Sequence, residues 1–84
     1  MAVGSELRLR RLTVDEALPE LDHYLNAAFM AGLPSVRIVH GKGTGVLRDA
    51  VHQVLAAHPL VKCFRQADYG EGDAGVTVVE LANQ

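Results

Sequence analysis

The sequence predicts an α/β fold in which two helices and four strands form one domain around a sheet. Alternating or continuous apolar runs predict strands at residues 6–11, 35–40, 61–67 and 75–81. Apolar residues at three- and four-residue spacing predict one helix before the second strand and another before the third. Because strand–helix–strand crossovers join parallel strands, at least three strands run parallel, and the last runs antiparallel to the third.

The composition predicts one small globular domain. Of the 84 residues, 49% are hydrophobic and 21% are charged, which excludes an intrinsically disordered chain. We expect residues 1–5 to form a flexible tail or the end of a linker, and residues 6–82 to form the single domain. Cys63 is the only cysteine, which excludes an intramolecular disulfide and a cysteine-based zinc site within this chain.

The length of the apolar runs and the net charge limit which classes of partner the protein can bind. The chain has no apolar run long enough to cross a bilayer and no hydrophobic signal core at its start, so we expect a soluble, cytoplasmic protein with no membrane partner. The formal net charge is −2, which is not the basic surplus typical of nucleic-acid-binding proteins. Nucleic-acid binding would therefore depend on local clusters of Arg and Lys.

The first strand ends in such a cluster. Its alternation of charged and apolar residues turns Leu7 and Leu9 inward and leaves Arg8 and Arg10 on the outside, with Arg11 following. Arginine forms bidentate hydrogen bonds with phosphate. This strand end therefore presents candidate anion ligands.

The first helix has clear start and stop signals. Thr13 and Glu16 form a capping box, while Gly32 and Pro34 end the helix. Pro19 removes one backbone donor inside it, so we expect a kink or a loosened first turn there. The buried stripe consists of Val14, Ala17, Leu18, Leu21, Leu25, Ala28 and Phe29.

The second strand ends at His40 and is followed by Gly-Lys-Gly-Thr-Gly at residues 41–45, which predicts a tight turn that opens the second helix, residues 45–57. Glycine permits positive φ and lets a ligand approach the backbone, and a helix N-terminus offers free N–H donors. The turn therefore predicts a phosphate-binding site, although such turns also occur as plain strand-to-helix connections. We expect His52, on the polar face of the second helix, to be solvated.

The loop between the last two strands, residues 68–74, is rich in glycine and acid. Carboxylates suit a hard cation, so Asp68, Glu71 and Asp73 could form a magnesium site. A solvated acidic loop is the alternative. We expect no metal site and no other cofactor in this domain.

The predicted topology brings these features to one edge of the sheet. Parallel strands end at the same edge, which is where ligands bind in open α/β sheets. There, Arg10, Arg11 and Lys42, with N–H groups of residues 43–45, would hold a phosphodiester. His40 titrates near neutrality and could serve as general acid or base. Alternatively, His40 bonds a neighbouring backbone carbonyl and simply ends the strand.

These motifs resemble the Smr (small MutS-related) domain. Residues 40–45 correspond to the most characteristic motif of that family, and the segment from Gly70-Glu71-Gly72 to Val79 is similar to its closing loop and strand. The similarity covers residues 7–81 and is strongest to the C-terminal domain of MutS-like ATPases that lack mismatch recognition. It implies a two-layer α/β (α+β) sandwich of βαβαββ order, with two helices and a mixed four-stranded sheet of strand order 1-2-4-3.

The resemblance also implies a function. Smr domains bind nucleic acid, and several nick DNA or cleave RNA, attached to an ATPase that acts in recombination and DNA repair or in ribosome rescue. The implied partners are DNA or RNA, the rest of a longer MutS-like ATPase chain, and the ribosome. The candidate catalytic residues are His40, Arg10 and Lys42, and the candidate phosphate-binding residues are Arg8, Arg10, Arg11, Gly41, Lys42, Gly43, Thr44, Gly45, Gly70, Glu71 and Gly72.

The first strand departs from the family pattern. That strand usually reads Leu-Asp-Leu-His-Gly or Leu-Asp-Leu-Arg-Gly, whereas here Arg8 replaces the aspartate and Arg11 replaces the glycine. An acidic group associated with cleavage is missing and positive charge is added, which favours a binding module over an endonuclease. A protein-interaction module that docks on the ribosome or a partner ATPase, through an apolar surface such as Val46 or Leu60, is the alternative.

Overall fold

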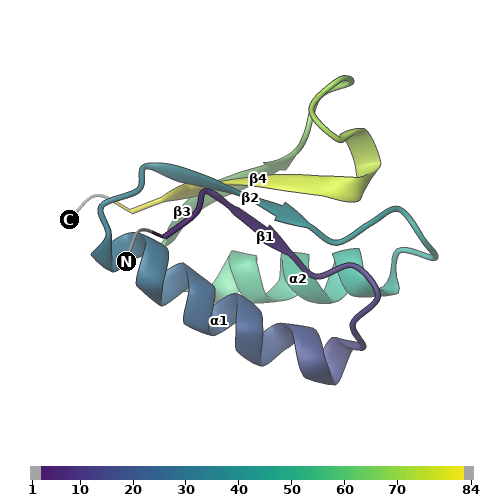
Figure 1. The fold of residues 1–84 in the computed structure, drawn as a ribbon, viewed down its shortest axis with the longest axis horizontal. Helices are drawn as coiled ribbons and strands as arrows, with labels where there is room; N and C mark the ends of the chain where they lie inside the picture. Colours follow the sequence, from purple (N-terminus) through teal and green to yellow (C-terminus); the bar gives the residue numbers. More distant parts are fainter. Residues whose placement is uncertain (1–2, 83–84) are drawn as a thin grey trace.

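The computed structural model describes residues 3–82 and shows a two-layer α/β sandwich (Figure 1). The elements are β1 (Glu6–Arg8), α1 (Val14–Met30), β2 (Ser35–Val39), α2 (Val46–Ala57), β3 (Val61–Gln66), the short 3-10 helix η1 (Asp73–Gly75) and β4 (Val76–Leu81). The sheet has the order β1-β2-β4-β3, with β1 parallel to β2 and β4 antiparallel to both of its neighbours. Both helices cover the same face of the sheet. These features confirm the predicted mixed sheet.

The core lies between the sheet and the two helices. Successive residues of a strand point to opposite faces, so Val36 and Ile38 of β2 face the helices together with Val79 of β4. The helices contribute small and branched side chains to the same layer. The buried cluster consists of Leu9, Ala17, Leu21, Leu25, Ala28, Val36, Ile38, Val51, Leu55, Val79 and Leu81.

The start of α1 is fixed by the predicted capping box. The Thr13 side chain accepts the Glu16 N–H at 3.2 Å, and the Thr13 N–H donates to the Glu16 carboxylate at 2.9 Å. The helix continues through Pro19 to Met30. Gly32, with φ of +78°, follows the helix end as expected. No helix of residues 3–82 is long and apolar enough to span a membrane.

The first strand is shorter than predicted. It ends at Arg8, although the Leu9 N–H still donates to the Val39 carbonyl at 2.8 Å. The chain then turns, because the Leu12 N–H bonds to the Leu9 carbonyl and Arg11 adopts a left-handed conformation with φ of +73°. Extending the strand to residue 11 was therefore wrong, and this turn sends Arg10 and Arg11 in different directions.

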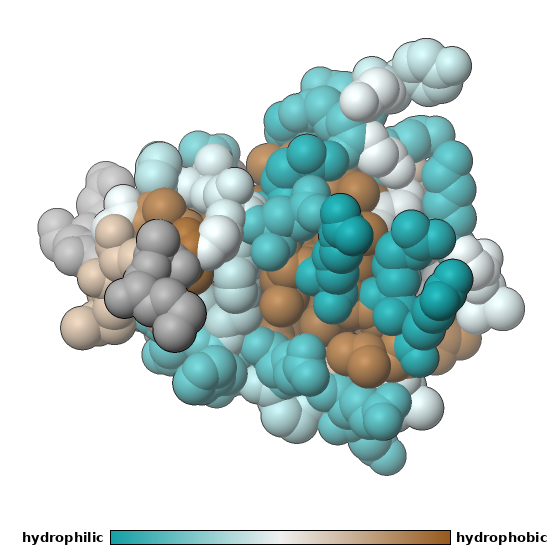
Figure 2. Space-filling model, in the orientation of Figure 1, coloured by the Kyte–Doolittle hydropathy of each residue, from teal (hydrophilic) through white to brown (hydrophobic). Residues whose placement is uncertain are grey.

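No helix covers the face of the sheet opposite α1 and α2, and this face carries several cations. The alternation that buries Ile38 places Arg37 and Val39 of β2 on this open face, and register adds Arg8 of β1 and Arg65 of β3. In the same orientation, Figure 2 shows hydrophilic side chains spread over much of the visible surface, with apolar surface between them.

The loop between β3 and β4 projects away from the helices (Figure 1). Arg37 of the open face donates to the carbonyl of Glu71, and Arg65 lies 3.4 Å from the Glu71 carboxylate. Tyr69 is 96% exposed in this loop. Gly72 has φ of +120°, and a Cβ there would lie 2.8 Å from Cβ of Val76.

We predict that Gly72→Ala destabilises the domain by at least about 1 kcal/mol more than Gly70→Ala. Both substitutions force an unfavourable positive φ on an L-residue, but only the Gly72 methyl overlaps Val76, because nothing lies within 4 Å of a Cβ at Gly70. Urea unfolding of the two variants measures the difference. Equal stability of both variants would contradict the close packing between Gly72 and Val76.

Candidate functional site

Three glycines shape the turn between β2 and α2. Gly41, Gly43 and Gly45 all have positive φ, at +83°, +31° and +88°. Gly45 is the N-cap of α2, and a Cβ there would lie 2.8 Å from Nη2 of Arg48. The predicted glycine turn is therefore present, and L-residues would be strained at each of these positions.

Several N–H groups of the turn are free. Among the hydrogen bonds of residues 3–82, none uses the N–H groups of Lys42, Gly43, Thr44 or Gly45, while the Val46 N–H reaches the Thr44 hydroxyl at 3.4 Å. These N–H groups belong to the segment that leads into α2, whose N-terminus carries partial positive charge from the helix dipole. The turn thus offers the backbone donors that an anion requires.

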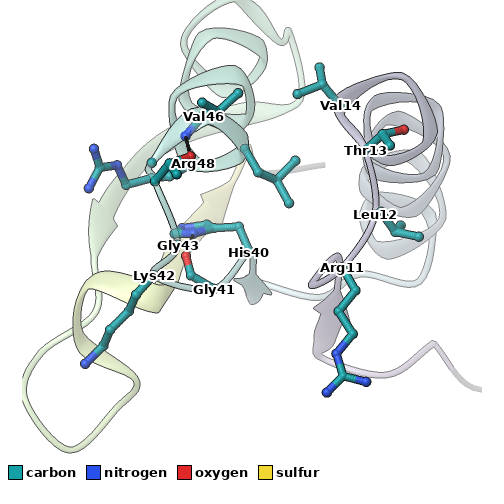
Figure 3. Close-up of a pocket in the computed structure, with 13 residues that line it drawn as sticks. Arg11, Leu12, Thr13, Val14, His40, Gly41, Lys42, Gly43, Val46 and Arg48 are labelled. Atoms are coloured by element: carbon teal, nitrogen blue, oxygen red, sulfur yellow. Dashed lines mark hydrogen bonds between the residues drawn. The ribbon is translucent and has the colours of Figure 1, made fainter.

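A cavity of about 300 Å³ lies between this turn and the segment that leads into α1. It is lined by residues 11–14 and 40–48, so the N-termini of both helices border it. Figure 3 shows Arg11 and Lys42 extending outward on either side of His40. We call this space the first cavity.

A second cavity of about 480 Å³ lies on the other side of the same turn. It is lined by Arg10, Val39, Gly41, Lys42, Gly43, Gly72, Gly75 and Val76. The turn residues 41–43 line both cavities. The basic end of the first strand is therefore divided, with Arg11 at the first cavity and Arg10 at the second.

The remaining candidate residues lie around these cavities. Thr44 and Gly45 line the first cavity. Arg8 lines neither; its side chain is 79% exposed and bonds Glu6 at 3.0 Å. Gly70 and Glu71 also lie outside both linings, with Glu71 tied to the open face through its carbonyl.

His40 is buried at the wall of the first cavity. Its side chain follows the alternation of β2 toward the helices, and only 5% of the residue is exposed. Nδ1 lies 2.9 Å from the Gly41 carbonyl oxygen, and Nε2 lies 2.8 Å from Oγ1 of Thr77. The same Thr77 oxygen lies 2.8 Å from Nε2 of His52 on α2. The two imidazoles are joined by one hydroxyl.

These contacts assign the proton positions for neutral rings. A carbonyl only accepts, so His40 Nδ1 carries the proton and donates it to Gly41. His40 Nε2 is then an acceptor for the Thr77 hydroxyl, and Thr77 in turn accepts the Nε2–H of His52. This chain of hydrogen bonds runs from α2 through β4 to the glycine turn, and each donor in it has an acceptor.

Two members of this chain were not expected. The prediction that His52 is solvated was wrong, because it bonds Thr77 and packs against Phe64 with ring centroids 5.1 Å apart. Thr77 is 1% exposed and belongs to the core side of β4. A sequence signal existed for Thr77. In this apolar strand, the side chains of Thr77 and Val78 point to opposite faces, and a hydroxyl on the buried face needs a hydrogen-bond partner.

Burial lowers the pKa of both His40 and His52. For His40, the hydrogen bond to the Gly41 carbonyl opposes this shift, and the charge of Arg48 adds to it. For His52, the neighbouring His40 and Arg48 lower the pKa further, while Asp49 opposes them. Both rings are thus favoured in the neutral form that the hydrogen-bond chain requires.

The carboxylates of the acidic loop form ion pairs with neighbouring cations. Lys42 lies 3.6 Å from Asp73, and Arg65 lies 3.8 Å from Asp68 and 3.4 Å from Glu71. Within residues 3–82, no three His, Cys, Asp or Glu side chains group closely enough to hold a metal ion. The Lys42–Asp73 contact instead connects the loop to the glycine turn.

Comparison with known proteins identifies relatives of the whole domain. The family model described as the Smr domain matches residues 7–82. The chain is 55% identical over 80 residues to Endonuclease MutS2 of Pelotomaculum thermopropionicum and 58% identical over 79 residues to that of Thermomicrobium roseum. These matches cover 95% and 94% of this chain but only 10% of each relative.

A solved structure agrees with the fold. The Smr domain of Thermus thermophilus MutS2 superposes with a TM-score of 0.91 and 48% identity, covering 94% of this chain and 99% of that one. The agreement includes the mixed sheet and its two helices. The chain thus spans one tenth of the length of the curated relatives but nearly all of the solved Smr domain from Thermus thermophilus.

We predict that the domain loses stability as the pH falls from 7 to 5. The folded pKa values of His40 and His52 lie below the ordinary value of 6.5, so the unfolded chain binds protons more readily, and stability falls as pH drops below that value. Urea unfolding across this range measures the slope. His52→Gln retains an N–H donor but does not titrate, so its slope is smaller, whereas His23→Gln on the surface of α1 follows the wild type. A wild-type stability that does not change with pH would contradict the inference that His40 and His52 are neutral in the folded domain.

Proposed function

The chain belongs to the Smr domain family, and we propose that it binds the phosphodiester backbone of DNA or RNA at the edge of the sheet where the glycine turn lies. The observation that carries this proposal is the set of free N–H groups of Lys42, Gly43, Thr44 and Gly45 in the turn that leads into α2. Relatives named as endonucleases support a nuclease or nucleic-acid-binding module.

The charges around the turn favour an anionic ligand. Arg11, Lys42 and Arg48 border the first cavity, and the side chain of Lys42 is 66% exposed. Its partner Asp73 is also partly exposed, so their contact at 3.6 Å is weak and can be replaced by a phosphate. A backbone that crosses the turn would thus meet N–H donors and at least three cations, despite the net charge of −2.

We also propose that the domain works as part of a longer MutS-like chain. Its curated relatives are about ten times its length, and in them the matching segment is one region of the protein. Whether that chain acts in recombination, DNA repair or ribosome rescue depends on the parts outside this domain.

Phosphodiester cleavage is a second candidate, favoured by the endonuclease names of the relatives and by His40 at the cavity wall. Lys42 would stabilise the developing negative charge, and His40 would transfer a proton. Arg10, the third predicted catalytic residue, lines the second cavity on the other side of the turn. Both ring nitrogens of His40 have protein partners, so proton transfer requires one of them to leave the Gly41 carbonyl or the Thr77 hydroxyl. Arg8, at the family's acidic position, supplies no carboxylate.

We predict that nucleic-acid affinity falls with salt and that Lys42→Ala weakens it. Each phosphate contact releases counterions, so losing one reduces the slope of log affinity against log salt by about 0.7–0.9. Fluorescence anisotropy with a labelled oligonucleotide measures this. As a control, Lys62→Ala removes an exposed lysine near the start of β3, at the end of the strand away from the glycine turn, and leaves the slope unchanged. An affinity independent of salt would rule out phosphate contact.

We predict that any nicking of supercoiled plasmid or structured RNA by the pure domain depends on His40. His40→Gln removes the titratable ring, so activity should fall at least about 100-fold, a usual contribution of general acid–base catalysis. Gel analysis of nicked product, with His23→Gln as the matched control and circular dichroism to verify folding, provides the measurement. Cutting that survives His40→Gln would indicate a contaminating nuclease and contradict this second candidate.

A further inference from the structure

The second cavity differs from the first in its chemistry. Its floor is apolar, formed by Val39 at the end of β2 and Val76 at the start of β4. Its charges belong to two residues only, Arg10 and Lys42, both exposed. Its other walls are glycines, namely Gly41, Gly43, Gly72 and Gly75.

The cavity offers few donors to a phosphate. The Gly41 N–H donates to the Gly75 carbonyl at 3.0 Å, and the Gly75 N–H donates to the Gly72 carbonyl at 3.1 Å. Those two donors are already used, and the free N–H groups of Lys42 and Gly43 belong to the turn that both cavities share. Valine side chains cannot replace the water around an anion. A phosphate is therefore better held at the turn, and the cavity suits an uncharged group with apolar faces.

The glycine walls suit a flat group. Without side chains, the backbone can be approached closely from the cavity. At position 72 only glycine fits, because a Cβ there would overlap Val76, which forms part of the cavity floor. Carbonyl oxygens at such walls, and the N–H groups that no protein acceptor uses, can bond the polar edges of a ring while the valines contact its faces.

The two cavities also have a geometric relation. Both are bounded by residues 41–43, so one molecule can have an anionic part on the turn and a second part in the second cavity. A nucleotide has this construction, because its sugar joins a phosphate to an uncharged aromatic base. The volume of about 480 Å³ lies within the range of sites for small organic ligands.

We propose that the second cavity holds an unstacked nucleobase whose phosphate lies on the glycine turn. This inference rests on the proposed function and specifies it, because a base can enter the cavity only after leaving its stack. The domain then recognises a strand with unpaired nucleotides through a base as well as through phosphates. The base is held by apolar contact and backbone groups.

The experiment compares tetrathymidylate with an all-abasic tetramer, which has the same phosphates and no bases. Amide chemical shifts of the isotope-labelled domain give both dissociation constants. We expect the wild type to bind tetrathymidylate about tenfold more tightly, with shifts at Gly72 and Val76 that the abasic tetramer does not cause. Equal affinity for both tetramers overturns the base site while leaving phosphate binding intact. Binding of neither tetramer overturns the proposed function as well.

Two matched variants locate the effect. Val39→Gln adds bulk and a hydrated amide to the cavity floor without changing charge or adding a ring that could stack on the base. It should reduce the preference for tetrathymidylate to less than about twofold. Val78→Gln makes the same change elsewhere on the open face, opposite Arg37 and Arg65, and should retain the tenfold preference. A preference that survives Val39→Gln in a folded variant overturns the location, as does the lack of shifts at Gly72 and Val76 in the wild type.

Discussion

The carbonyl oxygen of Gly75 holds the two parts of the site together. It accepts the N–H groups of His40 at 3.1 Å and Gly41 at 3.0 Å, which fixes the turn after β2 to the segment that enters β4. This contact exists because β4 lies between β2 and β3, so segments far apart in the chain meet at one edge. Both cavities share this turn, and therefore both depend on that oxygen.

The fold was largely predictable from the sequence. Periodic apolar residues identified all four strands and both helices, and the capping box at Thr13 located the start of α1. The strand order followed from the resemblance of residues 40–45 and of the closing loop to the Smr domain, since periodicity does not specify which strands are neighbours. The end of β1 was missed because a left-handed arginine, Arg11, gives no sequence signal for a turn.

The site was predictable as a location but not as an arrangement. Convergence of parallel strands brought Arg10, Arg11 and the glycine turn to one edge, as expected. Whether a residue faces one cavity or the other depends on backbone angles after the strand ends, which the sequence does not show. The bond between Thr77 and His52 depends on how α2 packs against β4, so no local pattern predicts it.

The start of β1 and the end of β4 lie at the edge of the sheet opposite the glycine turn. There the Arg37 N–H donates to the Ser5 carbonyl and the Leu81 N–H donates to the Pro34 carbonyl, and Figure 1 shows the start of β1 and the end of β4 on this side. A polypeptide that leads into β1 or continues from β4 would therefore attach on the side away from the candidate site and leave the glycine turn facing outward. The length and stiffness of that tether would set the effective concentration of the domain around a nucleic acid held elsewhere in the same assembly.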